Sequence, residues 1–336
     1  KLYTGTGSNG NAITGVGFQP DLIWIKDRVN TYSHRWYDVI RGVNSAISSD
    51  NGNAASQYSQ YGQLESIDSD GFTVGQGSSN GAAMNDSGDG HASWNWKAGG
   101  AGSSNSNGSI TSTVSANATS GFSIVKYTGT GSNATVGHGL SSAPKAVFVK
   151  NYSSGSNYDW ICYHKDAGNT GFLRLNTNNA YDTSINMFNS TDPTSTVFSI
   201  GSHAAINGSS DNFIAYCFSD VTGFSKFGKY KSTSNADNAF VYTGFKPSLL
   251  IIKRLTATDA WILTDNKRSN IGGGNPTDDL ILPNATNAEL VDNINRIDFL
   301  SNGFKVRPES GASATGDGST DNLSRTTWAT PTSTKI

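Results

Sequence analysis

Three segments of the chain carry the same pattern of polar and apolar positions. Each begins near a proline, continues as a run of mostly apolar residues and ends at a lysine: GFQPDLIWIK at Lys26, SSAPKAVFVK at Lys150 and GFKPSLLIIK at Lys253. Proline has no N–H to donate to a β-ladder, so it suits the first position of a strand. A short, near-continuous apolar run is typical of a strand buried inside a β-sandwich. We therefore expect three equivalent buried strands.

The spacing of these segments predicts an internal repeat. The sequence YTGTGSN occurs at Tyr3–Asn9 and again, letter for letter, at Tyr127–Asn133. The interval from a tyrosine (Tyr3, Tyr127 or Tyr230) to the proline is identical in all three copies, and so is the interval from the proline to the closing lysine. Further along, SIDSDGF matches DFLSNGF, and HASWNW matches FIAYCF. Fixed spacing at several points indicates a triplicated unit of about 100–120 residues.

The rest of each unit reads as short strands and turns. Apolar or alternating stretches are separated by turn signals such as Asp70-Gly71 and Asn302-Gly303, which are typical of β-hairpins. No stretch of a dozen residues keeps the helical period of apolar positions. We predict an all-β chain of three tandem β-sandwich repeats.

Glycine-rich composition suggests where the units begin and end. The run AGGAGSSNSNGS, Ala98–Ser109, resembles a flexible linker, and we expect it to tether the first unit. The junction Ser219–Tyr230 is shorter and carries aromatic residues, so the second and third units should pack together. The predicted boundaries are a first repeat at residues 1–100, a linker at 101–120, and further repeats at 121–224 and 225–336.

Composition excludes several classes of partner. Of the 336 residues 35% are hydrophobic and only 15% charged, with a formal net charge of -2. This charge balance gives no electrostatic reason to expect nucleic acid or an anionic membrane, and no apolar run approaches the roughly 20 residues that span a bilayer. Cys162 and Cys217 are too few for a disulfide framework. They are small buried hydrophobes, or alternatively one disulfide bridge.

The motifs YTGTGSN, GVGFQPDLIWIKDR, YDVIRGV, SDGF, WNWKAGG and VYTGFKP carry a family resemblance. Together they resemble a repeat domain common in tail and other virion surface proteins of marine bacteriophages, which is similar to concanavalin-A-like and SPRY-type jelly-roll sandwiches. The resemblance covers residues 1–310, whereas the closing segment DNLSRTTWATPTSTKI departs from the expected aromatic last strand. It implies three jelly-roll-like repeats and an adhesin or decoration element on the virion surface. It supplies no catalytic residues.

Residues shared by the units are expected to be structural, and residues that differ are candidates for function. Trp36 and Trp160 lie at the same interval after their prolines, and Trp261 follows Pro247 at nearly that interval. A tryptophan face also suits sugar stacking, but its recurrence favours core packing.

The candidate saccharide site therefore lies in the segments that differ. Aromatic rings beside Asp, Arg and His supply the stacking and directional hydrogen bonds that a saccharide needs. The alternative is ordinary polar loops with half-buried tyrosines. The third unit has neither histidine nor tyrosine in the matching segment Thr258–Arg268, so we expect it to assemble rather than bind. The predicted ligand-binding residues are His34, Asp38, Arg41, Tyr58, Tyr61, Tyr158 and His164.

Neither a metal site nor a catalytic site is predicted. The segments DSDG and NDSGDGH bring carboxylates close together, but neither continues into a complete calcium loop, and hairpin turns explain both. A glycosidase needs two carboxylates flanking the scissile bond, and no two of Glu65, Glu289 and Glu309 share a motif. We expect no cofactor.

The expected function is that of a non-enzymatic virion surface protein. It would bind host-surface polysaccharide or form part of a fibre with other virion proteins, as a homo-oligomer outside the cell. The alternatives are a purely structural capsid or tail decoration protein and a polysaccharide depolymerase.

Overall fold

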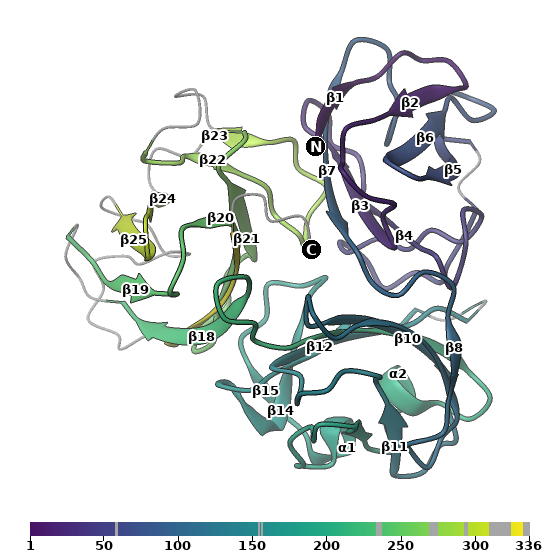
Figure 1. The fold of residues 1–336 in the computed structure, drawn as a ribbon, viewed down its shortest axis with the longest axis vertical. Helices are drawn as coiled ribbons and strands as arrows, with labels where there is room; N and C mark the ends of the chain where they lie inside the picture. The colour runs from purple at the N-terminus through teal and green to yellow at the C-terminus, as the bar shows by residue number, and fades with distance from the viewer. Residues whose placement is uncertain are drawn as a thin grey trace.

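The computed structural model describes residues 1–57, 60–153, 155, 157–232, 237–268, 275–291, 295–308 and 324–331. Within them the chain is built from short antiparallel strands, and its only helices are two single turns, α1 (Ile185–Phe188) and α2 (Ala204–Asn207). The prediction of an all-β chain is confirmed. Figure 1 shows the strands gathered in three lobes around a common centre. We call these lobes the first unit (residues 1–100), the second unit (101–224) and the third unit (225–331).

The first unit has an inner sheet, which faces the centre, and an outer sheet. The inner sheet runs in the order β1 (Leu2–Thr4), β7 (Gly90–Trp96), β3 (Leu22–Asp27), β4 (Arg35–Asp38). The outer sheet runs in the order β2 (Asn11–Ile13), β6 (Gly71–Gly75), β5 (Gln63–Asp68).

The second unit has a wider inner sheet. Its order is β15 (Asp182–Thr183), β14 (Gly168–Arg174), β13 (Ile161–His164), β12 (Ala146–Asn151), β17 (Asn212–Phe218), β10 (Phe122–Thr128), β9 (Ser112–Asn117), β8 (Ser103–Asn105). The outer layer contains the pair β11 (Ala134–Gly137) and β16 (Val197–Ile200), with α1 and α2 beside it.

The third unit again has two layers. Its inner sheet runs in the order β18 (Lys226–Lys231), β26 (Ser324–Pro331), β20 (Pro247–Arg254), β21 (Ile262–Asp265). The outer sheet is β19 (Phe240–Tyr242), β25 (Gly303–Pro308), β24 (Asn295–Leu300), and a separate pair is β22 (Asp279–Leu280) with β23 (Leu290–Val291). The last strand β26, whose sequence departs from the expected pattern, pairs with both β18 and β20.

The four strands nearest the centre follow the same order in every unit. The proline-led strands β3, β12 and β20 each lie between the last strand of the unit and the strand that follows them in sequence. Successive side chains of a strand point to opposite faces. In β3, Leu22 and Trp24 join the central core, whereas Ile23 and Ile25 join the core between the inner and outer sheets.

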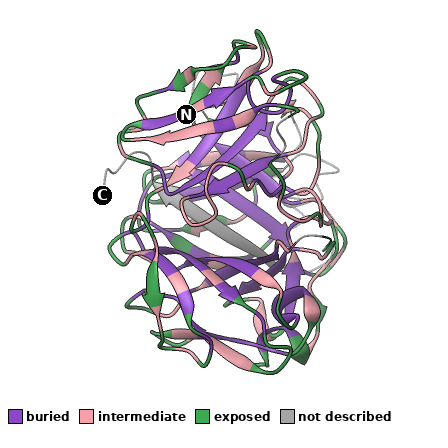
Figure 2. Ribbon diagram, turned by 90° about the vertical axis from the view of Figure 1, so that its right-hand side faces the viewer, coloured by how far each residue is buried: buried purple, intermediate pink, exposed green. Residues whose placement is uncertain are grey.

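This burial on both faces explains why the sequence run is apolar without alternation. The other two proline-led strands behave in the same way: Phe148 and Ile251 face the centre, and Val149 and Ile252 face the core of their own unit. Every residue of β3 and β12, and all but one of β20, is buried, and Figure 2 shows strands in the interior of the molecule in the colour of buried residues. The apolar run predicts the burial, but only the assembly of three units supplies the second covered face.

The segment predicted as a flexible linker, residues 101–120, belongs instead to the second unit. It contains β8 and β9, which extend the inner sheet of that unit. The chain enters this sheet at Ala98, whose N–H donates to Asp21 Oδ2 at 2.6 Å, and at Gly99, whose N–H donates to Ser115 Oγ at 2.9 Å. A Cβ at Gly99 would lie 2.6 Å from the carbonyl oxygen of Ala116. The glycines therefore permit a close crossing between two units rather than a loose tether.

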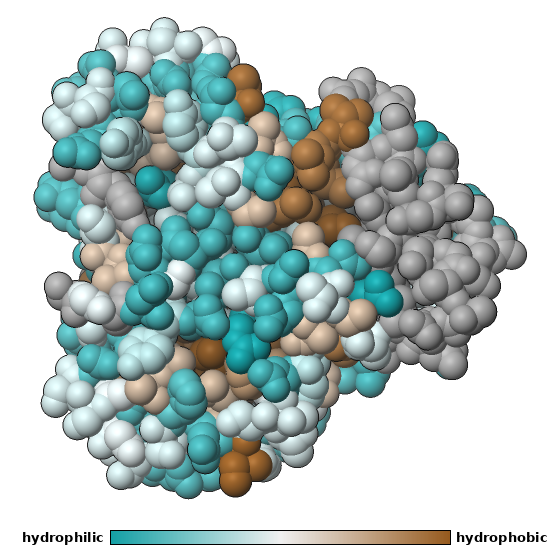
Figure 3. All heavy atoms as spheres, turned by 180° about the vertical axis from the view of Figure 1, so that it is seen from behind, coloured by the Kyte–Doolittle hydropathy of each residue, from teal (hydrophilic) through white to brown (hydrophobic). Residues whose placement is uncertain are grey.

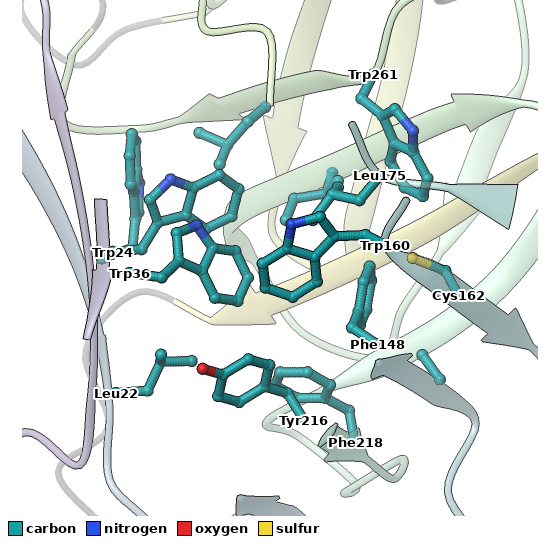
Figure 4. Packing of buried hydrophobic residues seen from close by; sticks show 14 of the residues in the cluster. Leu22, Trp24, Trp36, Phe148, Trp160, Cys162, Leu175, Tyr216, Phe218 and Trp261 are labelled. Atoms are coloured by element: carbon teal, nitrogen blue, oxygen red, sulfur yellow. The ribbon is translucent and has the colours of Figure 1, made fainter. Parts of the chain in front are cut away.

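Aromatic rings from all three units meet in the central core (Figure 4). The ring centroids of Trp24 and Trp36 are 4.5 Å apart, and those of Trp36 and Trp160 are 5.1 Å apart. Phe148 and Trp261 continue the contact at 6.3 Å. The prediction that the three tryptophans pack in a core is confirmed, since Trp36, Trp160 and Trp261 are 1%, 0% and 3% exposed.

Both cysteines are buried and free, Cys162 in the central core and Cys217 in the core of the second unit. They behave as small hydrophobic residues, which agrees with the first of the two interpretations. Within the described residues no helix combines the length and the apolar character needed to cross a bilayer.

Candidate functional site

Three equivalent loops, one from each unit, hold the neighbouring unit. We call residues 48–55, 174–181 and 282–289 the clasp loops. Near the end of each loop a backbone N–H donates to a carbonyl oxygen just beyond the closing lysine of the next unit. These bonds run from Ala55 to Tyr152 at 3.2 Å, from Tyr181 to Leu255 at 2.9 Å and from Glu289 to Arg28 at 2.9 Å. The third bond joins the last unit to the first, so the units form a closed ring (Figure 1).

One position in each inner sheet reaches the clasp loop of its neighbour. Strands β4, β13 and β21 each begin opposite the residue that precedes the closing lysine. The residues just before these strands are His34, Trp160 and Trp261. Each brings a side-chain nitrogen to the first carbonyl oxygen of a clasp loop: 3.1 Å from His34 Nε2, 2.8 Å from Trp160 Nε1 and 2.8 Å from Trp261 Nε1.

This register corrects the equivalence drawn from proline spacing. The spacing pairs Trp36 with Trp160, but the strand pairing and the shared clasp contact pair His34 with Trp160. The segment between the proline and this position is two residues longer in the second unit than in the other two. An alignment by proline spacing alone therefore places the first unit two residues out of register with the second. Because side chains alternate with a period of two, the misaligned residue still points to the same face of the sheet, so the error is not apparent from the sequence.

The closing lysines are buried at the same junctions. The Nζ of Lys150 donates to the carbonyl oxygens of Gly52 at 2.8 Å and Tyr158 at 2.9 Å, so it joins the first clasp loop to the second unit. Burial lowers the pKa of Lys150 to about 7 and the pKa values of Lys26 and Lys253 to about 8. These amines bind backbone carbonyl groups within the ring and do not face an open site.

Asp38 occupies a second position that links units. Its Oδ2 accepts a hydrogen bond from Tyr216 Oη of the second unit at 2.7 Å and one from Arg41 Nε at 2.6 Å. Burial alone would lower the pKa of Arg41, but Asp38 and Tyr216 beside it reverse this and raise the pKa. The guanidinium also donates to the carbonyl oxygen of Trp36 at 3.2 Å. The pair is thus satisfied internally.

Asp265 repeats this arrangement between the third and first units. Its Oδ2 accepts from Trp94 Nε1 at 3.0 Å and from Arg268 Nε at 2.7 Å. Burial acts to raise the pKa of Asp265, but the Arg268 guanidinium more than offsets this and holds the pKa below its usual range. Arg268 also pairs with Glu289 at 2.5 Å, and Glu289 forms a further ion pair with Arg28. The motif Asp-x-x-Arg, present in both segments, is the sequence signal for this repeated latch.

Several predicted ligand-binding residues are therefore structural. His34 and Asp38 are fully buried, and the side chain of Arg41 is 1% exposed. His164 is buried as well and accepts a hydrogen bond at Nδ1 from the N–H of Asp166 at 3.2 Å. The side chains of these four candidates are therefore buried, because β4 and β13 and the turns after them are covered by neighbouring units.

The predicted tyrosines differ from one another. Tyr158 is half-buried against the core of the second unit, and Tyr61 is 46% exposed. Tyr58 lies outside the described residues. Of the six described candidates, four therefore have buried side chains, Tyr158 is half-buried and Tyr61 is exposed.

An exposed pair of aromatic side chains, missed from the sequence, lies on the outer sheet of the third unit. Phe240 and Tyr242 of β19 are 46% and 67% exposed. They stand two residues apart on one strand and therefore point to the same face. Lys305 lies opposite Phe240 in the ladder and forms an ion pair with Asp237 at 2.6 Å. The corresponding strand of the first unit, NAI, has no aromatic residue. This difference between the two units is the sequence signal that could have identified the pair.

The described residues contain no group of three or more His, Cys, Asp or Glu side chains arranged to hold a metal ion. The carboxylates of the two latches are paired with arginine.

A family model described as a domain of unknown function, DUF7483, matches residues 1–320. The chain belongs to this family. The match begins in the first unit and ends in the third, before β26. Neither a curated protein nor a solved structure gives a significant match.

Proposed function

We propose that the chain is a non-enzymatic surface protein of a bacteriophage virion that binds saccharides of the host surface. It consists of three tandem jelly-roll-like repeats closed into a ring, and it works outside the cell as a homo-oligomer with other virion proteins. Neither a nucleic acid nor a membrane is a partner. The common strand order and the three clasp loops support the repeat, and the family resemblance of the motifs supports the virion setting.

The exposed aromatic pair carries the binding proposal, which places binding on the third unit, the one that the sequence predicts to assemble rather than bind. Aromatic rings on a rigid strand stack on the apolar face of a pyranose without losing much conformational freedom. Asp237, Lys305 and Arg307 lie beside the pair and offer hydrogen-bond donors and acceptors at its edge. The face of the molecule seen in Figure 3 is rich in hydrophilic side chains. This chemistry suits a weakly charged saccharide bound at several copies in an oligomer.

Two features support a non-enzymatic role. The acidic residues Asp38 and Asp265 are held by arginine in latches between units, where they stabilise the ring. The amine with the most lowered pKa among the closing lysines, Lys150, donates to backbone carbonyls and is fully buried.

A glycan array tests the proposal. The intact protein should bind one class of saccharide, and the double variant Phe240→Ala/Tyr242→Ala should lose about tenfold or more in affinity, since each stacked ring contributes about 1 kcal/mol. Ile185→Ala is the matched control, because Ile185 is 66% exposed on a different unit. It should bind normally.

The alternatives give different results in the same preparation. Stable incorporation into particles with no binding to any saccharide would identify a structural decoration protein. Reducing ends appearing during incubation with polysaccharide would identify a depolymerase. Binding that survives the double variant would move the site away from β19 and leave Tyr61 as the next aromatic side chain to change.

A further inference from the structure

His34 is held by two hydrogen bonds that require its neutral form. The indole Nε1 of Trp24 is a donor only, and it lies 2.8 Å from His34 Nδ1, so Nδ1 must accept. The ring proton is then on Nε2, which donates to the carbonyl oxygen of Leu282 at 3.1 Å. Adding a proton to Nδ1 would place two N–H groups against each other. The neutral tautomer therefore satisfies both neighbours, and the cation does not.

The charged groups around His34 act from a distance or on its backbone. Burial is the largest effect and lowers the pKa of His34 to about 4; Asp50 acts to raise it and Lys26 to lower it. Asp50 accepts from the backbone N–H of His34 at 2.8 Å, and Arg35 donates to the carbonyl oxygen of His34 at 3.2 Å. These hydrogen bonds involve the backbone of His34 and not its imidazole.

Charged groups of the third unit lie further along the same junction. Glu289, at the end of the third clasp loop, forms ion pairs with Arg28 and Arg268. Arg268 in turn pairs with Asp265. Burial acts to raise the pKa of Asp265, but the Arg268 guanidinium holds this pKa below its usual range, so this ion pair persists through the mildly acidic range.

His34 closes the one junction that the chain itself does not bridge. Consecutive units are joined covalently at residues 100–101 and 224–225, whereas the described residues of the first and third units meet through packing, hydrogen bonds and the ion pair between Arg28 and Glu289. At the two bridged junctions the same position is Trp160 or Trp261, and an indole does not titrate. The ring thus has one closure at which this position can respond to acid and two at which it cannot.

We propose that the ring is an acid-sensitive clasp, in which protonation of His34 releases the third clasp loop and separates the third unit from the first. The step is a proton transfer from solvent to Nδ1, which replaces the hydrogen bond from Trp24 with two opposed N–H groups; their repulsion displaces the ring and with it the contact of Nε2 with Leu282. Because the depressed pKa belongs to the folded state, the stabilisation is present above about pH 6.5 and is lost as pH falls toward about 4.

Hydrogen exchange read by mass spectrometry tests the clasp on the full chain. Exchange rates are corrected for their intrinsic pH dependence and compared between pH 7 and pH 4.5. Residues 24–36 and 282–289 should lose protection by at least tenfold, whereas 48–55 with 150–160 and 174–181 with 253–261 should keep theirs. Equal loss at all three junctions, or no loss at any, would overturn the proposal.

Two variants distinguish protonation of His34 from a general loss of stability at the junction. His34→Gln keeps an N–H donor for Leu282 but cannot be protonated, and the double variant Trp24→Phe/His34→Trp copies the Phe148 and Trp160 pair of the second unit. Both should keep protection at 282–289 unchanged between pH 7 and pH 4.5. His91→Gln is the matched control, because His91 is also buried with a lowered pKa but stacks on Tyr3 within the first unit. An acid response that persists in both His34 variants would assign it to another group and overturn the proposal.

Discussion

The junction between the third and first units differs in chemistry from the other two. At the two chain-bridged junctions an indole N–H of Trp160 or Trp261 donates to the clasp loop at 2.8 Å. At the remaining junction His34 makes that contact, and Trp24 fills the space that Phe148 occupies in the second unit. Glu289 also forms ion pairs with Arg28 and Arg268 at this junction. The same backbone geometry is therefore closed by two different kinds of interaction.

Trp36, which packs against Trp24, carries a buried indole N–H. The indole Nε1 of Trp36 is buried without a hydrogen-bond partner among the described residues, although its ring packs against Trp24, Trp160 and Tyr216. Leaving a buried donor unpaired costs about 1–3 kcal/mol. The unpaired donor lies where the first unit packs against the second, since Trp160 and Tyr216 belong to the second unit.

The largest expected effect is removal of an indole from a bridged junction. Trp160→Ala should cost about 3–5 kcal/mol in free energy of unfolding, because a buried aromatic ring and its hydrogen bond are both lost. Trp261→Ala should behave alike, and His34→Ala should cost less because a smaller side chain is removed. Urea denaturation measures all three. A His34→Ala variant less stable than Trp160→Ala would break the comparison.

A somewhat smaller effect is expected from the arginine latches. Arg268→Ala leaves Asp265 and Glu289 without their shared partner at the unbridged junction, and breaking a buried ion pair costs about 3 kcal/mol. Arg41→Ala leaves only Asp38 uncompensated, which Tyr216 still contacts, so its cost should be lower. Thermal unfolding of the two variants ranks them. Equal melting temperatures would mean that Glu289 contributes nothing to the closure.

The smallest effect is expected on the outside of the ring. Tyr61→Ala should change the free energy of unfolding by less than about 0.5 kcal/mol, since the side chain is 46% exposed and does not belong to the central core. The measurement is the midpoint of urea denaturation. A clear fall of that midpoint would show that Tyr61 packs into the core of the first unit and would remove it from the candidate binding residues.

The sequence predicts where the buried strands lie, but it does not predict which other parts of the chain pack against them. The proline-to-lysine runs predict buried strands, and β3, β12 and β20 occupy those segments. The pattern does not show what covers the second face of each strand. An apolar residue buried between the two sheets of one unit has the same sequence signal as an apolar residue buried between two units. The same ambiguity makes Ala98–Ser109 look like a linker, since glycine serves both a loose chain and a tight crossing.

The candidate site shows the same limit more sharply. His34 looks like a surface residue in the sequence because it differs from Trp160 and Trp261, yet it differs because its junction differs. Asp38 looks like a surface residue too, yet it recurs as Asp265 in a buried ion pair with arginine. Positions that differ between similar units can lie either on the surface or in an interface between units. Only a contact with a residue distant in sequence, such as that of His34 with Leu282, distinguishes an interface position from a surface position. The sequence places two aromatic residues, Phe240 and Tyr242, in one short strand. It does not show that they are exposed, because that depends on which face of the outer sheet points to solvent.

The closed ring also has a consequence for how the chain is made. A ribosome adds about 5–20 residues per second, so the first unit emerges on the order of ten seconds before the third clasp loop that covers it. During that interval the tryptophan face of β3, β4 and β7 has no partner from the third unit, and it is exposed to association with other nascent chains. Completion of the native state waits for contacts between the two ends of the chain, which are the slowest kind to form. Efficient production of this protein therefore depends on how well that face is protected while synthesis is unfinished.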